Sequence, residues 1–368
     1  MSDIANSTIR GRKHGAALAA GMATIALLAA ACGSSGTKTG SPPTTASNGG
    51  SAKADLAYFK GKTITMIAPD APGGGFDNWA RTTAPYMAQY LHATVNVENI
   101  PAGNTIVGQN TLASSQPNGL TIGWLNVTED VSDKAAGVTG VTFDPGQLGI
   151  IGSTPPIPVV VLATPKSGFK SFESLTTASQ VTALTQTKGS TALIENVILA
   201  GFGVKVKYIA GYESSSALKA GFSRGDGEIA VDNISAFGPF ITGNAGVPLM
   251  VTSAVPSSSP LAPDLTNVPT VTQYEKSHTL SGNLAQVLNA VMDIYTYNAT
   301  MAAPAGVPAG RLAALQAAMK WTMQQPAAQQ QAAKLHLEAG YLTPQATTQA
   351  IQAGFASAAL IKPYVPGK

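Results

Sequence analysis

A turn of three consecutive glycines stands between an apolar run and a segment with helical character. The run is ITMI (residues 64–67), and the turn lies in APDAPGGGFDNWA (residues 68–80). Glycine is costly to order, so this turn is either very tight or brings the backbone close to a ligand. A glycine turn that enters a helix presents free N–H groups at the positive end of the helix dipole, which favours anions. The alternative is a plain connection in which Asp77 caps the helix or pairs with Arg81, four residues later.

Two more turns of small residues follow along the chain. One is ENIPAGNTIVG (residues 98–108), and the other is QPNGLTIG (residues 116–123). The first again joins a predicted strand to a predicted helix. Two such turns from adjacent strand–helix units can face one ligand.

Strand and helix signals alternate along the chain, which predicts an α/β fold with parallel or mixed sheets covered by helices. Strands are expected at residues 63–68, 94–98 and 120–125, with helices at 78–91 and 106–114. A second series starts at residues 158–162, and the chain is helical from residue 311 onward, with breaks at Pro326 and Gly340. We expect two domains, residues 56–160 plus 282–368 and residues 161–281, with a ligand cleft between them.

The N-terminal segment has the pattern of a secretory signal. Arg10, Arg12 and Lys13 precede the uncharged residues 15–31, a stretch shorter than the roughly 20 residues that a membrane span needs. Cys32, the only cysteine, follows small residues and marks a lipobox, so we expect residues 1–32 to be a lipoprotein signal and Cys32 to carry lipid. Residues 33–55 are rich in Gly, Ser, Thr and Pro and are typical of a flexible tether. The predicted location is extracytoplasmic, on the outer face of the cell membrane.

Composition argues against several functions. Charged residues make up 11% of the chain and the net charge is +3, so a clustered basic surface for nucleic acid is not expected. The four histidines are scattered without metal-ligand spacing, at positions 14, 92, 278 and 336. We expect no metal and no cofactor.

Taken in order, the three turns resemble the periplasmic substrate-binding proteins of the tripartite tricarboxylate transporter family, also called the Bug family. The family pattern P-x-x-P/A-G-G-x-x-D, then A-R, corresponds to PDAPGGGFD (69–77) with Ala80 and Arg81. The patterns V-x-x-E-N-x-P-G-A-G-G-x-x-G and P-D-G-x-T correspond to residues 95–108 and 117–121. Later matches are RGDGEIA (224–230), NVPT (267–270) and AAPAGVP (302–308), so the resemblance covers residues 60–365.

The resemblance implies a two-domain periplasmic-binding-protein-like fold of type II that closes on a ligand carboxylate. First-domain loops would hold the carboxylate through backbone amides and water, and Asp77 would cap amides or fix a water. The ligand-binding residues implied by the resemblance come from both domains. They are Gly73, Gly74, Gly75, Phe76, Asp77, Gly103, Asn104, Thr105, Asn126, Thr187, Gly189, Ser190, Gly211, Tyr212 and Asp232. The second-domain wall would also include the rest of the stretch from Gly211 to Ser214, and Asn233.

Two departures from the family keep the ligand open. The family's G-A-G-G reads AGNT (102–105) here, and V-P-Y-x-G is replaced by YIAGYES (208–214). Trp79, Trp124 and Tyr212 hint at an aromatic acid, although aromatic residues near turns more often belong to the core. The substrate of any one family member is therefore not transferred.

Two other functions compete with solute binding. Ser216 and Lys219 fit the S-x-x-K pattern of penicillin-binding enzymes, but the K-T-G at 38–40 lies in the tether, on the wrong side of Ser216, and no G-x-S-x-G occurs. A structural or sensory lipoprotein that keeps the fold without transport is the second alternative. We predict a monomeric binding protein, not an enzyme, that delivers a small organic carboxylate to the permease subunits of a tripartite tricarboxylate transporter.

Overall fold

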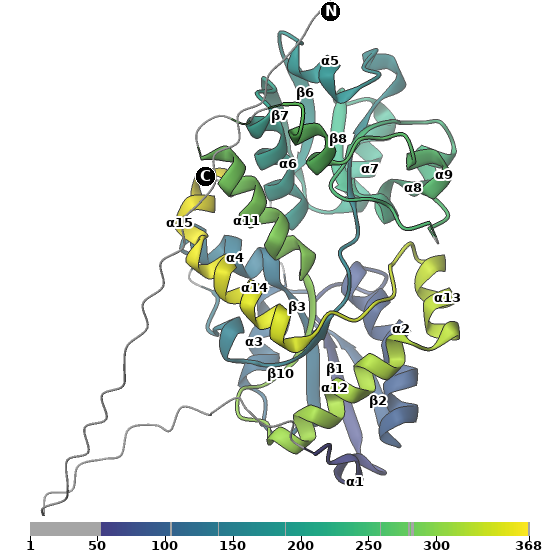
Figure 1. The fold of residues 1–368 in the computed structure, drawn as a ribbon, viewed down its shortest axis with the longest axis vertical. Helices are drawn as coiled ribbons and strands as arrows, with labels where there is room; N and C mark the ends of the chain where they lie inside the picture. The colour runs from purple at the N-terminus through teal and green to yellow at the C-terminus, as the bar shows by residue number, and fades with distance from the viewer. Residues whose placement is uncertain are drawn as a thin grey trace, which may run out of the picture. The chain divides into compact units, whose positions relative to one another are not determined.

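The computed structural model describes residues 53–366, apart from residues 104, 139, 188, 258, 279, 281 and 282. The predicted signal, Cys32 and nearly all of the tether lie outside this part. The described residues belong to one compact unit (Figure 1). No helix among them is long and apolar enough to cross a membrane.

Two five-stranded sheets are built on the same plan. The first has the order β2 (Thr94–Asn99), β1 (Thr63–Ala68), β3 (Thr121–Asn126), β10 (Ala299–Ala303) and β4 (Gly149–Ser153). The second has the order β7 (Val206–Tyr212), β6 (Val181–Gln186), β8 (Ile229–Asn233), β5 (Val159–Ala163) and β9 (Val247–Val251). In each sheet the first three strands are parallel, and the fourth strand is antiparallel to both of its neighbours.

Helices cover both faces of each sheet, as the alternation of signals predicted. The helices that follow strands of the first sheet are α2 (Gly75–Leu91), α3 (Ile106–Ser114), α4 (Val127–Ala136) and α12 (Ala309–Met323). Those associated with the second are α5 (Phe172–Thr176), α6 (Ser190–Gly201), α7 (Ser215–Arg224) and α8 (Ile234–Thr242). The rest are α1 (Leu56–Phe59), α9 (Ala262–Leu265), α10 (Val271–Glu275), α11 (Leu284–Thr296), α13 (Pro326–Lys334), α14 (Pro344–Ala356) and α15 (Ala358–Ile361).

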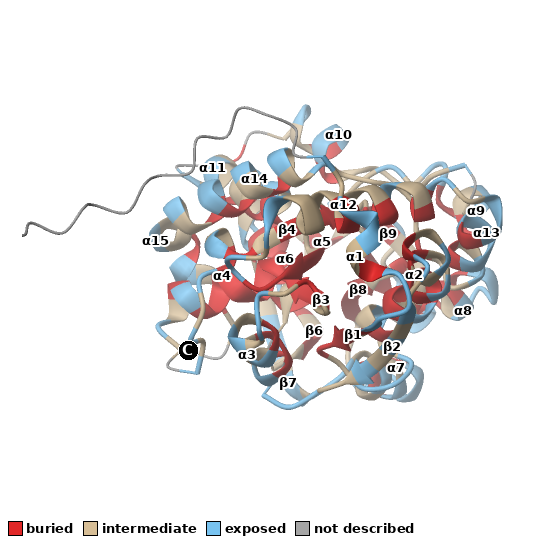
Figure 2. Cartoon of the chain, turned by 90° about the horizontal axis from the view of Figure 1, so that it is seen from below, coloured by how far each residue is buried: buried red, intermediate tan, exposed pale blue. Residues whose placement is uncertain are grey.

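The core consists of layers on the two faces of each sheet, and Figure 2 shows buried residues along the strands and the helices. On one face of the first sheet, Trp79 of α2 stacks on Trp124 of β3 with ring centroids 6.0 Å apart, and both rings are buried. Trp124 therefore belongs to the core, whereas Trp79 also lines the cavity described below. The β5 strand, VVVLA, is buried at every position, as expected for a strand covered on both faces.

The chain crosses between the sheets at two places. Residues 154–158 lead from β4 to β5, and residues 297–298 lead from α11 to β10. The Tyr295 hydroxyl donates a hydrogen bond of 2.8 Å to the Ile157 carbonyl and so ties the two crossings together. The first crossing precedes the boundary expected at residue 160, because β5 already starts at Val159. The return to the first sheet comes after α11, later than the expected residue 282, since α11 packs on α6 in the core of the second sheet.

Candidate functional site

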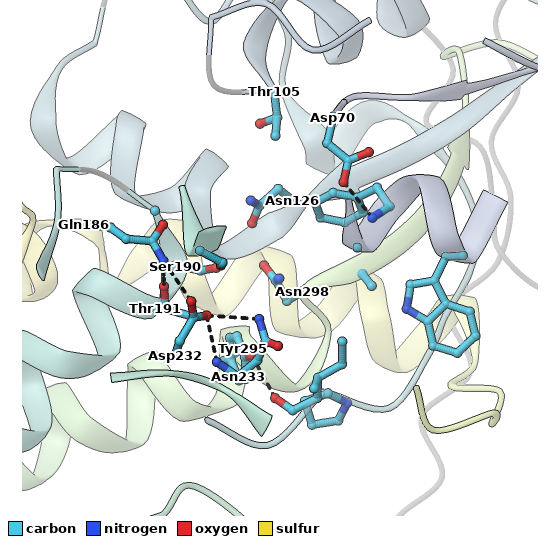
Figure 3. Close-up of a pocket in the computed structure, with 18 of the residues that line it drawn as sticks. Asp70, Thr105, Asn126, Gln186, Ser190, Thr191, Asp232, Asn233, Tyr295 and Asn298 are labelled. Atoms are coloured by element: carbon cyan, nitrogen blue, oxygen red, sulfur yellow. Dashed lines mark hydrogen bonds between the residues drawn. The ribbon is translucent and has the colours of Figure 1, made fainter. Parts of the chain in front are cut away.

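A cavity of about 320 Å³ lies where residues from both sheets meet (Figure 3). From the first sheet and its helices come Asp70, Gly75, Phe76, Trp79, Thr105, Asn126, Asn298 and Ala299. From the second come Gln186, Gly189, Ser190, Thr191, Glu213, Ser215, Asp232 and Asn233, and the crossings and α11 add Pro155, Pro156, Ile157 and Tyr295. A volume of this size suits a small organic molecule.

Six helices in the described part of the chain begin at this cavity. They are α2, α3, α4, α6, α7 and α8, whose N-cap or first-turn residues line it. The arrangement follows from the topology, since the parallel strands of each sheet end at one edge and feed helices there. Each helix N-terminus carries a partial positive charge, and α3 and α6 begin without a side-chain cap from the described residues, so the cavity favours an anionic group.

The glycine turn is organised by Asp70 rather than left open. The Asp70 carboxylate accepts hydrogen bonds from the Phe76 and Asp77 amides at 2.8 and 2.9 Å, so it caps α2. A Cβ on Gly74 would lie 2.3 Å from Asp70 Oδ2, which explains a glycine at that position. Burial raises the pKa of Asp70 to about 6, although the two amide hydrogen bonds oppose the shift. Two of the α2 amides expected to meet a ligand are therefore already bonded.

Asp77 does not line the cavity and instead stabilises the glycine turn. Its carboxylate accepts from the Gly73 amide at 2.7 Å and from Asn99 Nδ2 at 2.9 Å, and it pairs with Arg81 Nε at 2.9 Å. Burial raises the pKa of Asp77, but the hydrogen bonds from Arg81, Gly73 and Asn99 outweigh it and leave the pKa below its usual value. Both uses considered from the sequence, capping of amides and pairing with Arg81, occur together.

The second-sheet wall centres on Asp232 at the end of β8. Its Oδ1 accepts from the Asn233 amide at 2.7 Å and from Asn233 Nδ2 at 3.1 Å, and its Oδ2 accepts from Gln186 Nε2 at 3.2 Å. The side chain is fully buried. Burial raises the pKa of Asp232 to about 6, against hydrogen bonds from Ser215, Asn233 and Gln186 and the charge of Lys219.

The wall of the cavity formed by the first sheet and its helices includes polar groups that could donate hydrogen bonds to a ligand. Asn126 uses its side-chain oxygen to accept from the Glu129 amide at 3.2 Å, which leaves its amide N–H groups as donors. Thr105 sits at the start of α3 with a positive φ of 73°, and Gln109 Nε2 donates to its hydroxyl at 2.8 Å. On the opposite wall no side chain caps α6, whose N-cap is Gly189 with a φ of 117°.

The cavity brings together about half of the residues implied by the resemblance. Gly75, Phe76, Thr105, Asn126, Gly189, Ser190 and Asp232 line it. The residues that do not line it are Gly73, Gly74, Asp77, Gly103, Thr187, Gly211 and Tyr212. Tyr212 instead donates its hydroxyl to Asp226 Oδ2 at 2.9 Å, and Gly73, Gly74 and Asp77 shape the turn behind the cavity. Asn104 and Cys32 lie outside the described residues.

Several lining residues were not named as site residues from the sequence. Gln186, Thr191 and Ser215 flank named positions at strand ends and helix starts, and this placement could have identified them. Asp70 precedes the glycines and was interpreted only as part of the turn. Tyr295 near the end of α11, Asn298 in the return crossing and Ala299 at the start of β10 carry no local signal of a contact with the cavity.

The serine of the alternative enzyme does not line the cavity, and its K-T-G at residues 38–40 lies outside the described residues. Ser216 is exposed and is not among the lining residues, whereas its neighbour Ser215 is. Within the described ranges, no group of three or more His, Cys, Asp or Glu side chains could hold a metal ion.

No protein-family model matches the sequence. A stretch of 72 residues is 42% identical to a UPF0065 protein of Bordetella pertussis, and this match spans 20% of the chain and 22% of that relative. The chain thus matches less than a quarter of the length of that curated relative.

Solved structures match over most of the chain. The periplasmic binding protein BugD gives a TM-score of 0.62 at 20% identity, covering 83% of this chain and 98% of BugD. MatC (Rpa3494) from Rhodopseudomonas palustris with bound malate gives a TM-score of 0.62 at 16% identity, covering 82% of this chain and 99% of MatC. Rpa4515 from R. palustris with adipate gives a TM-score of 0.64 at 16% identity, covering 83% of this chain and 98% of Rpa4515. The chain therefore has the fold of these periplasmic binding proteins, and the fold predicted from the sequence is confirmed.

Proposed function

We propose that this chain is a solute-binding protein of the Bug family that captures a small organic carboxylate in the cavity between its two sheets. The observation that carries the proposal is the convergence of six helix N-termini on one cavity of about 320 Å³. Backbone amides at helix starts bind carboxylates without a side-chain cation. The order of the three turn motifs and the fold shared with proteins that hold malate or adipate support the same function.

Capture would occur by closure of the two halves about the crossings. Residues 154–158 contain Pro155, Pro156 and Pro158, whose fixed φ angles restrict the first crossing. The hydrogen bond from Tyr295 to Ile157 couples it to the second crossing. Because Ile157 and Tyr295 also line the cavity, a ligand would touch the hinge directly.

The setting completes the proposal. Lipid on Cys32 would hold the protein at the outer face of the cell membrane, with residues 33–55 as the tether. The closed, loaded protein would then deliver its ligand to the permease subunits of a tripartite tricarboxylate transporter, without acting as an enzyme.

A thermal-shift screen of the purified full chain in mild detergent tests the binding role. The panel contains citrate, succinate, glutamate and terephthalate. A ligand at 100 times its Kd stabilises the folded state by about 3 kcal/mol, a rise in melting temperature of several degrees. A flat panel on well-folded protein would count against the function and favour the structural or sensory lipoprotein.

The Gly75→Val variant checks that binding occurs in this cavity. A Cβ on Gly75 meets no atom within 4 Å, so the added side chain enters open space at a residue that lines the cavity. Gly201→Val is the control, since among the described residues its Cβ meets only Leu280, at 3.6 Å, and Gly201 does not line the cavity. We expect Gly75→Val to lose the ligand-induced shift and Gly201→Val to keep it.

A further inference from the structure

Gln109 is a buried polar residue that contacts two residues of the cavity without lining it. It lies on α3 and is 1% exposed. Its side-chain oxygen accepts from the Asn126 amide at the end of β3, at 3.0 Å, and its Nε2 donates to the Thr105 hydroxyl at the start of α3, at 2.8 Å. Thr105 and Asn126 belong to the wall formed by the first sheet and its helices, and Figure 3 shows them apart from Asp232. One buried side chain therefore holds two residues of this wall.

The backbone fixes the direction of these hydrogen bonds. The amide N–H of Asn126 can only donate, so the Gln109 atom that faces it must be the side-chain oxygen. The NH2 group of Gln109 then faces Thr105 and must donate to the hydroxyl oxygen. A hydroxyl that accepts a hydrogen bond keeps its own hydrogen for another acceptor. Thr105 is thereby kept as an O–H donor at the cavity.

The carboxyl of Asp130 agrees with this orientation of the Gln109 amide. Burial raises the pKa of Asp130 well above its usual value, the charge of Asp133 adds to the shift, and a hydrogen bond from Gln109 opposes it. A hydrogen bond that lowers the pKa of a carboxyl is one that the carboxylate accepts, so Gln109 donates here too. Turning the amide over would place two donors face to face at Asn126.

The backbone of Thr105 has a conformation that threonine rarely adopts. Its φ is 73°, in the left-handed region, where a β-branched residue is an outlier. The family pattern has a glycine at this position of the turn, and glycine adopts such a φ readily. This chain thus combines a backbone suited to glycine with a hydroxyl-bearing side chain that lines the cavity. Strained backbone of this kind persists where the surroundings hold it, and it clusters at functional sites.

We propose that Gln109 is a positioning residue for ligand binding, because it holds the Thr105 hydroxyl as a hydrogen-bond donor to a carboxylate oxygen of the ligand. This inference rests on the proposed binding function and adds a residue that none of the sequence motifs marks. A carboxylate only accepts hydrogen bonds, so it needs donors from the wall. Asn126 can supply donors beside Thr105, since its side-chain oxygen is occupied by the Glu129 amide.

Single substitutions test the hydroxyl and its partner. Isothermal titration calorimetry of the purified full chain in mild detergent measures the affinities for succinate, glutamate, citrate and terephthalate. For each compound that binds, we expect Thr105→Val and Gln109→Met each to weaken binding at least five-fold, and Thr105→Ser, which keeps the hydroxyl, less than two-fold. Gln316→Met is the control, because Gln316 on α12 also donates its Nε2, to the Ile150 carbonyl at 2.9 Å, and does not line the cavity. An unchanged affinity in either Thr105→Val or Gln109→Met would overturn the inference.

The double variant Thr105→Val with Gln109→Met tests whether Gln109 acts through Thr105. If it does, the loss of affinity in the double variant should be at least three-fold smaller than the product of the two single losses. Losses that multiply would show that Gln109 supports the wall independently of the hydroxyl, which overturns the inference and leaves the binding function standing. Absence of binding by all four compounds to the unaltered protein would refute both.

A second variant covers the case in which Gln109→Met does not fold. Gln109→Glu then takes its place in the same comparison. A glutamate carboxylate still accepts from the Asn126 amide, but it has no N–H to donate to Thr105. The expected losses and the results that would overturn the inference stay the same.

Discussion

Replacement of Glu195 by glutamine should make the protein much less sensitive to alkaline pH. Glu195 lies on α6 and is 1% exposed. Burial raises the pKa of its carboxyl from 4.5 to about 8, with the Thr185 hydroxyl opposing and the Asp232 carboxylate adding to the shift. The folded state therefore holds a proton that the unfolded state releases above pH 4.5.

The sign and size of the effect follow from this difference. The contribution of the Glu195 carboxyl to the free energy of unfolding is fully present below pH 4.5. It is lost as the pH rises toward 8, by about 1.4 kcal/mol per pH unit. The loss amounts to about 3 kcal/mol at pH 7 and about 5 kcal/mol above pH 8. A glutamine side chain at this position would not titrate, and its neutral amide has nearly the shape of the protonated acid.

Urea unfolding at pH 5, 7 and 9, followed by circular dichroism, measures the difference between Glu195→Gln and the unaltered protein. We expect similar stability at pH 5 and a variant more stable by about 5 kcal/mol at pH 9. Glu98→Gln, at an exposed position of β2, serves as the control and should show no such trend. A difference that stays constant across this pH range would refute the reasoning, because it would show that Glu195 is not a buried neutral acid.

Three further substitutions test individual contacts in the fold by the same urea measurement. Arg81→Ala should lower the free energy of unfolding by about 1–2 kcal/mol, because it removes a partner of the buried Asp77. Arg81→Lys keeps the positive charge and should lose less, so an equal loss in both variants would contradict a role for the charge. Asn126→Ala should cost about 1 kcal/mol through loss of the α4 cap, and an unchanged midpoint would contradict this. Gly354→Ala should lower the free energy of unfolding by about 1–3 kcal/mol, since the new Cβ would lie 2.3 Å from Ile294 Cγ2. The same substitution should be less destabilising in a protein that already carries Ile294→Ala, and an equal loss in both proteins would contradict a steric cause.

The local elements were largely predictable from the sequence because each has a strong local signal. The strand at residues 63–68 and the helix at 106–114 match β1 and α3 at both ends. The helix expected at 78–91 starts three residues earlier, at Gly75, because the Asp70 carboxylate caps its first turn from outside the helix. A cap supplied from that distance along the chain does not follow the usual N-cap spacing.

The cavity wall was less predictable because side chains reach it from distant parts of the chain. The resemblance to a family identified the motif residues Gly75, Thr105 and Asp232. A family pattern implies which distant residues lie close together in the fold, whereas the local periodicity of the sequence does not. Tyr295 and Asn298 lie beside them only because the chain returns to the first sheet after α11.

The antiparallel fourth strand of the first sheet has a consequence for biosynthesis. β10 lies between β3 and β4, and Thr300 pairs with both Leu125 and Ser153. When a ribosome has made only the first half of the chain, β3 and β4 both lack this partner, and their open edges are prone to pair with other chains. Pairings between segments so far apart in the chain form slowly. The first sheet is therefore completed only when residues 299–303 have been made, and until then the edges of β3 and β4 stay open to pairing with other chains.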